Sequence, residues 1–194
     1  MEADWEFETG PDAAGLAAPV IETRWAGFVD LQREPARAKE LPETAQLPEL
    51  AGALARLNAP FSPVWTSKCD VWTSLKTGDF DPDELDAPPG CAAHAMGCYI
   101  DLLPRGDRQW LQPERAADDC KELCRILGAV RLRCGRADLV IRHALTISSA
   151  SDPDSRNLGI TAYLTSCGAS QAEAKQALQA ALAALVDALV ATRS

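Results

Sequence analysis

The sequence lacks the short motifs that mark many nucleotide-binding and hydrolytic enzymes. It contains no P-loop, no Gly-x-Gly-x-x-Gly fingerprint and no Gly-x-Ser-x-Gly elbow. The residues that a nucleotide-binding loop or an α/β-hydrolase site requires are therefore missing. No run approaches the roughly 20 apolar residues that span a bilayer. Residues 1–4 are acidic where a secretory signal would be basic, so we expect a cytoplasmic protein with no membrane partner.

Positive charge and aromatic residues are also scarce. The 19 Lys and Arg residues are outnumbered by 28 Asp and Glu residues, which gives a net charge of −9. This charge would repel a phosphate backbone and excludes nucleic acid as an expected partner. Aromatic residues make up 6% of the chain and apolar residues 47%, a balance that favours helices packed on a sheet. The 7 cysteines form no Cys-x-x-Cys motif, so free thiols are expected rather than a disulfide framework.

An internal repeat is the strongest positive feature of the chain. Residues 28–31 read Phe-Val-Asp-Leu and residues 99–102 read Tyr-Ile-Asp-Leu, and the context of residues 70–71 resembles that of residues 138–140. The repeat indicates a duplicated strand-helix-strand unit. Such a unit specifies a fold but not a reaction.

Apolar periodicity gives the expected order of elements. Strands are predicted over residues 20–31, 62–73, 95–103, 138–147 and 158–166, with helices that end near residues 58 and 128 and a long helix that begins at residue 170. The order βαββαββα predicts an α+β fold, a ferredoxin-like duplicated split βαβ with an antiparallel sheet, extended by a C-terminal strand and long helix.

One domain is expected from this length and composition. Residues 1–19, rich in Gly and Pro, are predicted to form an N-terminal arm. Residues 20–194 then form a single α+β domain, in which two βαβ repeats (about 20–75 and 95–148) are followed by a βα extension (157–192).

The favoured functional hypothesis is a soluble acidic binding protein. Strand alternation places a mixture of aromatic and charged residues on the sheet face opposite the helices: Glu22, Arg24, Phe28, Tyr99, Asp101, Arg142 and Tyr163. Such a face suits a protein partner, a small ligand or a homodimer, or is simply solvated. The acidic loop 76–93 would contribute to binding. A regulatory protein, or one like small immunity or inhibitor proteins that neutralise a basic partner, fits this charge.

The alternative hypothesis is a small enzyme at the loop edge of the sheet. Cys91 would act as nucleophile or ligand, His94 as acid or base, and Asp30 as the carboxylate that orients His94. This hypothesis requires the three side chains to converge beside a pocket. The other histidine, His143, alternates with apolar residues and is expected to be buried.

No cofactor is expected, and zinc is the alternative. The spacing Cys91-x2-His94-x3-Cys98 offers ligand types that zinc takes, but Cys98 shares strand parity with core residues. Asp79 and Asp81 suggest a second, irregular cation site. An EF-hand loop is excluded there, because its Gly and Glu positions hold the wrong residues.

Overall fold

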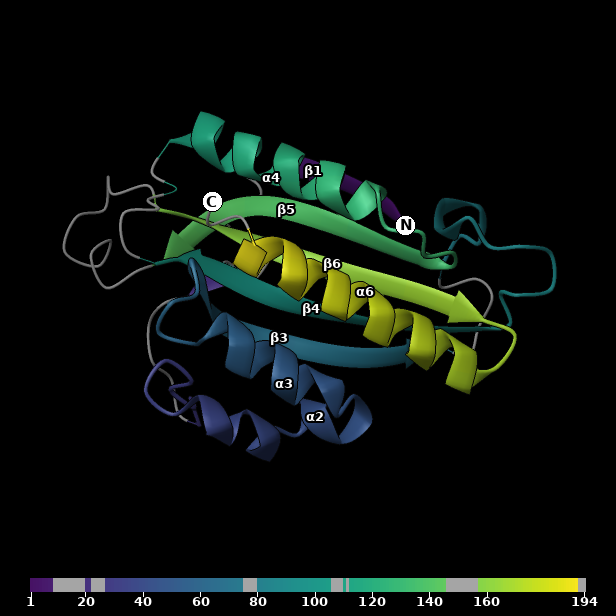
Figure 1. Cartoon of the computed structure of the whole chain (residues 1–194), viewed down its shortest axis with the longest axis horizontal. Coiled ribbons are helices and arrows are strands. Elements are labelled where there is room, and N and C mark those ends of the chain that lie inside the picture. Colours follow the sequence, from purple (N-terminus) through teal and green to yellow (C-terminus); the bar gives the residue numbers. More distant parts are fainter. Residues whose placement is uncertain are drawn as a thin grey trace.

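The computed structural model describes residues 1–8, 20–21, 27–74, 80–105, 110, 112–145 and 157–191. These residues form a mixed α+β fold in which helices pack on a sheet (Figure 1). The strands are β1 (Glu2–Glu8), β2 (Val20–Ile21), β3 (Val64–Ser74), β4 (His94–Pro104), β5 (Gly135–Leu145) and β6 (Leu158–Gly168). The helices are η1 (Pro35–Glu40), α2 (Glu43–Gln46), α3 (Glu49–Leu57), η2 (Asp83–Leu85), α4 (Pro113–Gly128) and α6 (Gln171–Ala191), of which η1 and η2 are 3-10 helices.

The sheet is mixed, with strand order β1-β5-β6-β4-β3. β1 runs parallel to β5, whereas the β5–β6, β6–β4 and β4–β3 pairs are antiparallel. The short β2 pairs in parallel with the last residues of β5. The units β3-β4-α4 and β5-β6-α6 therefore meet at the central β4–β6 pair.

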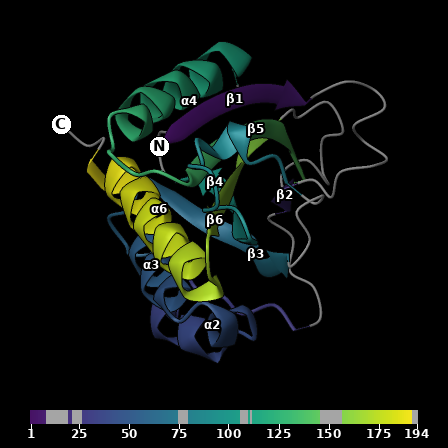
Figure 2. The same ribbon diagram turned by 90° about the vertical axis from the view of Figure 1, so that its right-hand side faces the viewer.

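Helices α3, α4 and α6 all cover the same face of the sheet (Figures 1 and 2). Residues alternate along β4, so Cys98, Ile100 and Leu102 point toward these helices and are fully buried. Burying one large aliphatic side chain in this way contributes about 1.5–3 kcal/mol. The main core consequently lies between the helices and the sheet.

The long helix α6 belongs to this core. By length and composition alone it could cross a membrane. Leu178, Leu182 and Leu185 are nevertheless buried, while Asp187 on the outer side pairs with Arg56 of α3 at 2.7 Å. One buried stripe with a polar outer side is the pattern of a core helix in a soluble domain.

The N-terminal segment forms an edge strand rather than an arm. Glu2–Glu8 pairs in register with residues 136–142 of β5. Ala3 and Trp5 pack against the core, so the alternate acidic residues Glu2, Asp4 and Glu6 point to the other face. The predicted arm is thus wrong for residues 2–8, and residues 9–19 lie outside the described part of the chain.

Within the described residues, the strand predicted over residues 20–31 is present as β2 alone. Residues 22–26 lie outside the described part, and residues 27–34 form turns rather than a strand. The carboxylate of Asp30 accepts hydrogen bonds from the backbone N–H groups of Gln32 and Arg33 at 3.2 and 3.3 Å. An aspartate that bonds its own following backbone stabilises a turn, which explains the difference.

The ferredoxin-like strand order is not confirmed. In that order the strand at residues 20–31 would lie in the middle of the sheet, but β6 occupies the position between β5 and β4. Nearly every residue of β6 is buried on both faces, as a central strand requires. The coarser prediction of an α+β fold holds.

The helix-free face of the sheet carries a second small apolar cluster. It consists of Trp65 of β3, Leu103 of β4 and Ala144 of β5. The short β2, which pairs with β5 at Ala144, also lies against β3, β4 and β6. This end of the helix-free face is therefore partly covered by β2.

Candidate functional site

Four of the predicted binding residues gather on the helix-free face. Tyr99 and Asp101 of β4 lie directly opposite Tyr163 and Thr161 of β6. Arg142 of β5 reaches the same group. We call these five residues the sheet-face cluster. Figure 2 shows the helices on the opposite side of the sheet.

Hydrogen bonds and ring contacts connect the sheet-face cluster. The Thr161 hydroxyl donates a hydrogen bond to the Asp101 carboxylate at 2.7 Å. Arg142 donates to the Tyr163 hydroxyl at 2.9 Å, and its guanidinium lies 5.5 Å from the centroid of that ring. The rings of Tyr99 and Tyr163 are 5.8 Å apart at 47°. The cluster is thus organised across three strands.

Burial changes the acid–base behaviour of two cluster residues. Burial raises the pKa of Asp101, while the hydrogen bond from Thr161 and the charges of Lys68 and Arg142 oppose the rise. The pKa of Tyr99 rises to about 12, through burial and then through the nearby Asp101 carboxylate. At neutral pH the Tyr99 hydroxyl remains protonated and can donate a hydrogen bond.

The edge strand contributes a residue that the sequence analysis missed. Glu8 of β1 accepts a hydrogen bond from Arg142 Nε at 2.6 Å, and the two side chains are 35% and 15% exposed. Residues 2–8 alternate acidic and apolar positions, so their period of two could have revealed the strand. Its partner could not be predicted, since β1 and β5 are distant in sequence.

Two adjoining cavities of about 250 Å³ each lie on the same face, between the edge of the sheet and the loop 80–93. Glu84, Arg136 and Asp138 line both of them. We call the two cavities together the acidic groove. Its charged and aromatic lining comprises Asp4, Trp5, Glu6, Trp72, Phe80, Asp81, Glu84, Arg136 and Asp138.

The groove has an excess of negative charge. Five carboxylates line it together with the Arg136 guanidinium. Arg136 already forms an ion pair with Asp138 at 2.8 Å, and the hydrogen bond from Arg136 to Asp138 raises the pKa of the guanidinium. The other four carboxylates form no ion pair with Arg136, so the groove suits a cationic group.

Trp72 forms an aromatic wall of the cavity that Phe80 and Asp81 also line, which we call the Trp72 cavity. Its residue is 37% exposed, and its indole lies against Gly97 of the neighbouring strand. A Cβ atom at Gly97 would come within 2.5 Å of the ring. The absence of a side chain at Gly97 therefore lets the indole lie flat on the sheet.

The described part of the acidic loop contributes directly to the groove. Leu85 is buried and anchors η2, while Asp86 after it takes a left-handed backbone conformation with φ of 48°. Asp81 lines the Trp72 cavity and accepts a hydrogen bond from the backbone N–H of Asp83 at 2.9 Å. Residues 76–79, including the predicted cation ligand Asp79, lie outside the described residues.

The remaining predicted binding residues are Glu22, Arg24 and Phe28. Glu22 and Arg24 lie outside the described residues. Phe28 is half-buried in the turn region before η1. Its predicted place on a strand was wrong, because the chain turns at Asp30.

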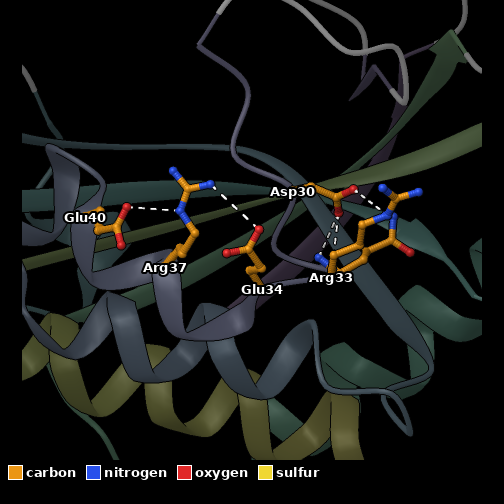
Figure 3. Close-up of polar contacts among 6 residues, drawn as sticks. Asp30, Arg33, Glu34, Arg37 and Glu40 are labelled. Carbon is orange, nitrogen blue, oxygen red and sulfur yellow. Dashed lines mark hydrogen bonds and ion pairs between the residues drawn. The ribbon is translucent and has the colours of Figure 1, made fainter.

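The catalytic arrangement of Asp30, Cys91 and His94 is not formed as predicted. Figure 3 shows Asp30 turned toward Arg33, with which it makes an ion pair at 3.5 Å. His94 opens β4, and its Nδ1 atom is buried without a hydrogen-bond partner. Asp30 consequently does not orient the ring through that nitrogen. Cys91 lies in the loop before β4 and is half-buried.

The prediction for His143 is wrong. His143 is exposed, although strand parity predicted a buried ring. The other histidine, His94, is half-buried.

Metal ligands do not assemble within the described residues. No group of three or more His, Cys, Asp or Glu side chains there is placed to hold a metal ion. Cys98 is fully buried in the core, as its strand parity indicated. The spacing Cys91-x2-His94-x3-Cys98 therefore does not produce a three-ligand set.

Comparisons with protein-family models, curated proteins and solved structures gave no match. The candidate site accordingly rests on the geometry of this chain alone.

Proposed function

We propose that this is a binding protein that receives a basic segment of a partner protein in the acidic groove and on the adjoining sheet face. The observation that carries the proposal is the charge of the groove, which the described residues line with five carboxylates and one arginine, the ion-paired Arg136. The whole chain has a net charge of −9, which would steer a basic partner toward it.

The aromatic wall adds affinity for Lys or Arg side chains. A cation over an indole face gains about 0.5–2 kcal/mol, more when water is excluded. The protein already makes one such contact, since Lys121 Nζ lies 5.6 Å from the Trp5 ring centroid. A Lys or Arg side chain in the Trp72 cavity would meet Trp72 together with Asp81 and Glu84.

The groove and the sheet-face cluster together offer a continuous surface. Asp138 of the groove lies directly opposite Tyr163 of the cluster, and Arg136 lies opposite Thr165. A bound chain could therefore place a basic residue in the groove and contact the tyrosines beyond it. A regulatory or inhibitor-like role in the cytoplasm is the class of function that this surface supports.

The test is a titration of penta-arginine and penta-lysine peptides followed by calorimetry at low and high salt. We expect binding that weakens as salt increases, because the pairs are partly exposed. Glu84→Gln should weaken binding by about two- to fivefold, the range of an exposed ion pair.

Asp118→Asn on α4 is the matched control. Asp118 is an exposed carboxylate that pairs with Lys121 at 3.0 Å, and its loss changes the net charge of the protein by the same amount. The control should bind like the unmodified protein. Equal losses for Glu84→Gln and Asp118→Asn would mean that only net charge matters, and the groove would be rejected as the site.

A further inference from the structure

Two thiols face each other beside the groove. The backbone N–H of Cys167 donates a hydrogen bond to the carbonyl oxygen of Cys134 at 3.0 Å, next to the Gly135–Ser166 pair of the β5–β6 ladder. Cys134 immediately precedes β5 and has a left-handed backbone conformation, with φ of 59°. The backbone hydrogen bond nevertheless places it beside Cys167, and neighbouring antiparallel residues have Cα atoms about 4.5–5.5 Å apart, within the roughly 4.4–6.8 Å that a disulfide spans.

The side chains of Cys134 and Cys167 are also close to each other. The two thiols are joined by a side-chain hydrogen bond, and Cys91 on the acidic loop lies near enough to influence Cys167 electrostatically. That loop is fastened to the same place, because Ala93 N–H donates to the Gly168 carbonyl at 3.1 Å. Cys134 is half-buried, whereas Cys167 is 1% exposed.

We propose that Cys134 and Cys167 are a redox modification site, in which a hydroperoxide converts the two thiols to a reversible disulfide. In the first step the Cys134 sulfur attacks the peroxide, giving a sulfenic acid and releasing an alcohol, or water from hydrogen peroxide. In the second step the Cys167 sulfur attacks the sulfenic sulfur. The S–S bond forms as the S–O bond breaks, and the hydroxyl leaves as water with the Cys167 proton.

The environments assign the order of the two steps. Burial, followed by the nearby Cys134 and Cys91, raises the pKa of Cys167 to about 12. Cys167 therefore stays a thiol and is shielded from solvent, so the more accessible Cys134 meets the oxidant first. Arg136 is two residues after Cys134 and Thr165 is two residues before Cys167. Both line the Trp72 cavity, so the linkage would lie at the edge of the groove. The inference does not depend on what the groove binds.

Peptide mapping of the intact folded protein tests this inference. The protein is treated with hydrogen peroxide, its remaining thiols are blocked with iodoacetamide, and it is digested with trypsin without reduction. We expect a product that joins the peptides 134–136 and 157–175, lighter by two hydrogen atoms than their sum and separated by dithiothreitol. The peptide positions follow from Arg133, Arg136, Arg156 and Lys175.

Variants distinguish a specific pair from general thiol oxidation. Cys134→Ser should abolish the linked product, whereas Cys124→Ser, at a half-buried cysteine of α4, should leave it unchanged. A disulfide that instead contains Cys91, or sulfinic acid at Cys134 without a link, would overturn the proposal. Mapping the unmodified chain alone decides the outcome even where a variant folds poorly.

Discussion

Thr161 and Asp101 face each other on the two central strands, and the threonine hydroxyl donates a 2.7 Å hydrogen bond to the aspartate carboxylate. Asp101 is only 2% exposed. A buried carboxylate is costly unless it is hydrogen-bonded. The pair therefore holds a polar group at the centre of the helix-free face, where a purely structural sheet would place apolar residues.

Removing the hydroxyl tests this relationship. Thr161→Val should lower the free energy of unfolding by about 1–3 kcal/mol, because the variant leaves the Asp101 carboxylate without its hydrogen-bond donor. Urea denaturation measures the change. Thr73→Val is the control, since Thr73 is exposed on β3 and a surface change there should stay within about 0.5 kcal/mol. Equal losses would show that strand packing, rather than the hydrogen bond, is responsible.

The raised pKa of Asp101 predicts a pH dependence of stability. Burial raises this pKa in the folded state, so the unfolded chain releases the proton first as the pH increases. The contribution of Asp101 to stability is then full below the unfolded pKa and is lost as the pH rises through the folded pKa.

Asp101→Asn removes this titration. The stability of the unmodified protein relative to the variant should decline from acidic to neutral pH, as measured by urea denaturation at a series of pH values. A relative stability that instead increases toward neutral pH would mean that the ionised Asp101 is stabilised by its neighbours.

Local periodicity predicted much of the fold and part of the site. The apolar stripes of α4 and α6 and the alternation of β4 and β6 depend only on neighbouring residues, so they could be derived without knowing the partners of each element. The same alternation placed Tyr99 and Tyr163 on one face, where they lie 5.8 Å apart.

Long-range pairing could not be predicted in this way. Nothing within residues 2–8 shows that they add to the edge of β5, and nothing within β6 shows that it inserts beside β4. The acidic groove depends on both events, since Asp4 and Glu6 come from β1 and Glu84 from the loop before β4. Its residues were consequently recognised only in part.

The end of α3 offers a prediction about a buried amide. Asn58 is fully buried. Its Nδ2 atom donates hydrogen bonds to the Leu54 carbonyl at 2.8 Å and to the Thr66 hydroxyl at 2.7 Å. Its Oδ1 atom accepts a hydrogen bond from the Thr66 backbone N–H at 3.1 Å. Asn58→Ala should cost about 1–3 kcal/mol or more, because it leaves these partners unsatisfied. Thermal and urea denaturation provide the measurement.

The neighbouring Arg56→Ala is the comparison for Asn58→Ala. Arg56 pairs with Asp187 on the surface, with the two side chains 51% and 67% exposed. An exposed pair of this kind contributes about 0–1 kcal/mol. A cost for Arg56→Ala as large as that of Asn58→Ala would contradict the expectation that the buried amide contributes more to stability than the exposed ion pair.

Substitution of glycine by alanine is expected to have opposite effects on stability at Gly97 and Gly52. Gly97→Ala would place a Cβ atom 2.5 Å from the Trp72 ring, so the indole must move off the sheet and the protein should lose stability. In α3, a Cβ atom at Gly52 meets nothing within 4 Å, and Gly52→Ala should stabilise the helix by about 0.5–1 kcal/mol. Urea denaturation gives both values.

The binding experiment separates the role of Trp72 from its contribution to stability. If the indole is the wall of a cation site, Gly97→Ala should weaken binding of penta-arginine because the ring is displaced, whereas Gly52→Ala should leave binding unchanged. Trp72→Leu should weaken binding as well, since it retains an apolar side chain but removes the aromatic face. Full binding by both Gly97→Ala and Trp72→Leu would show that the carboxylates alone recognise the peptide.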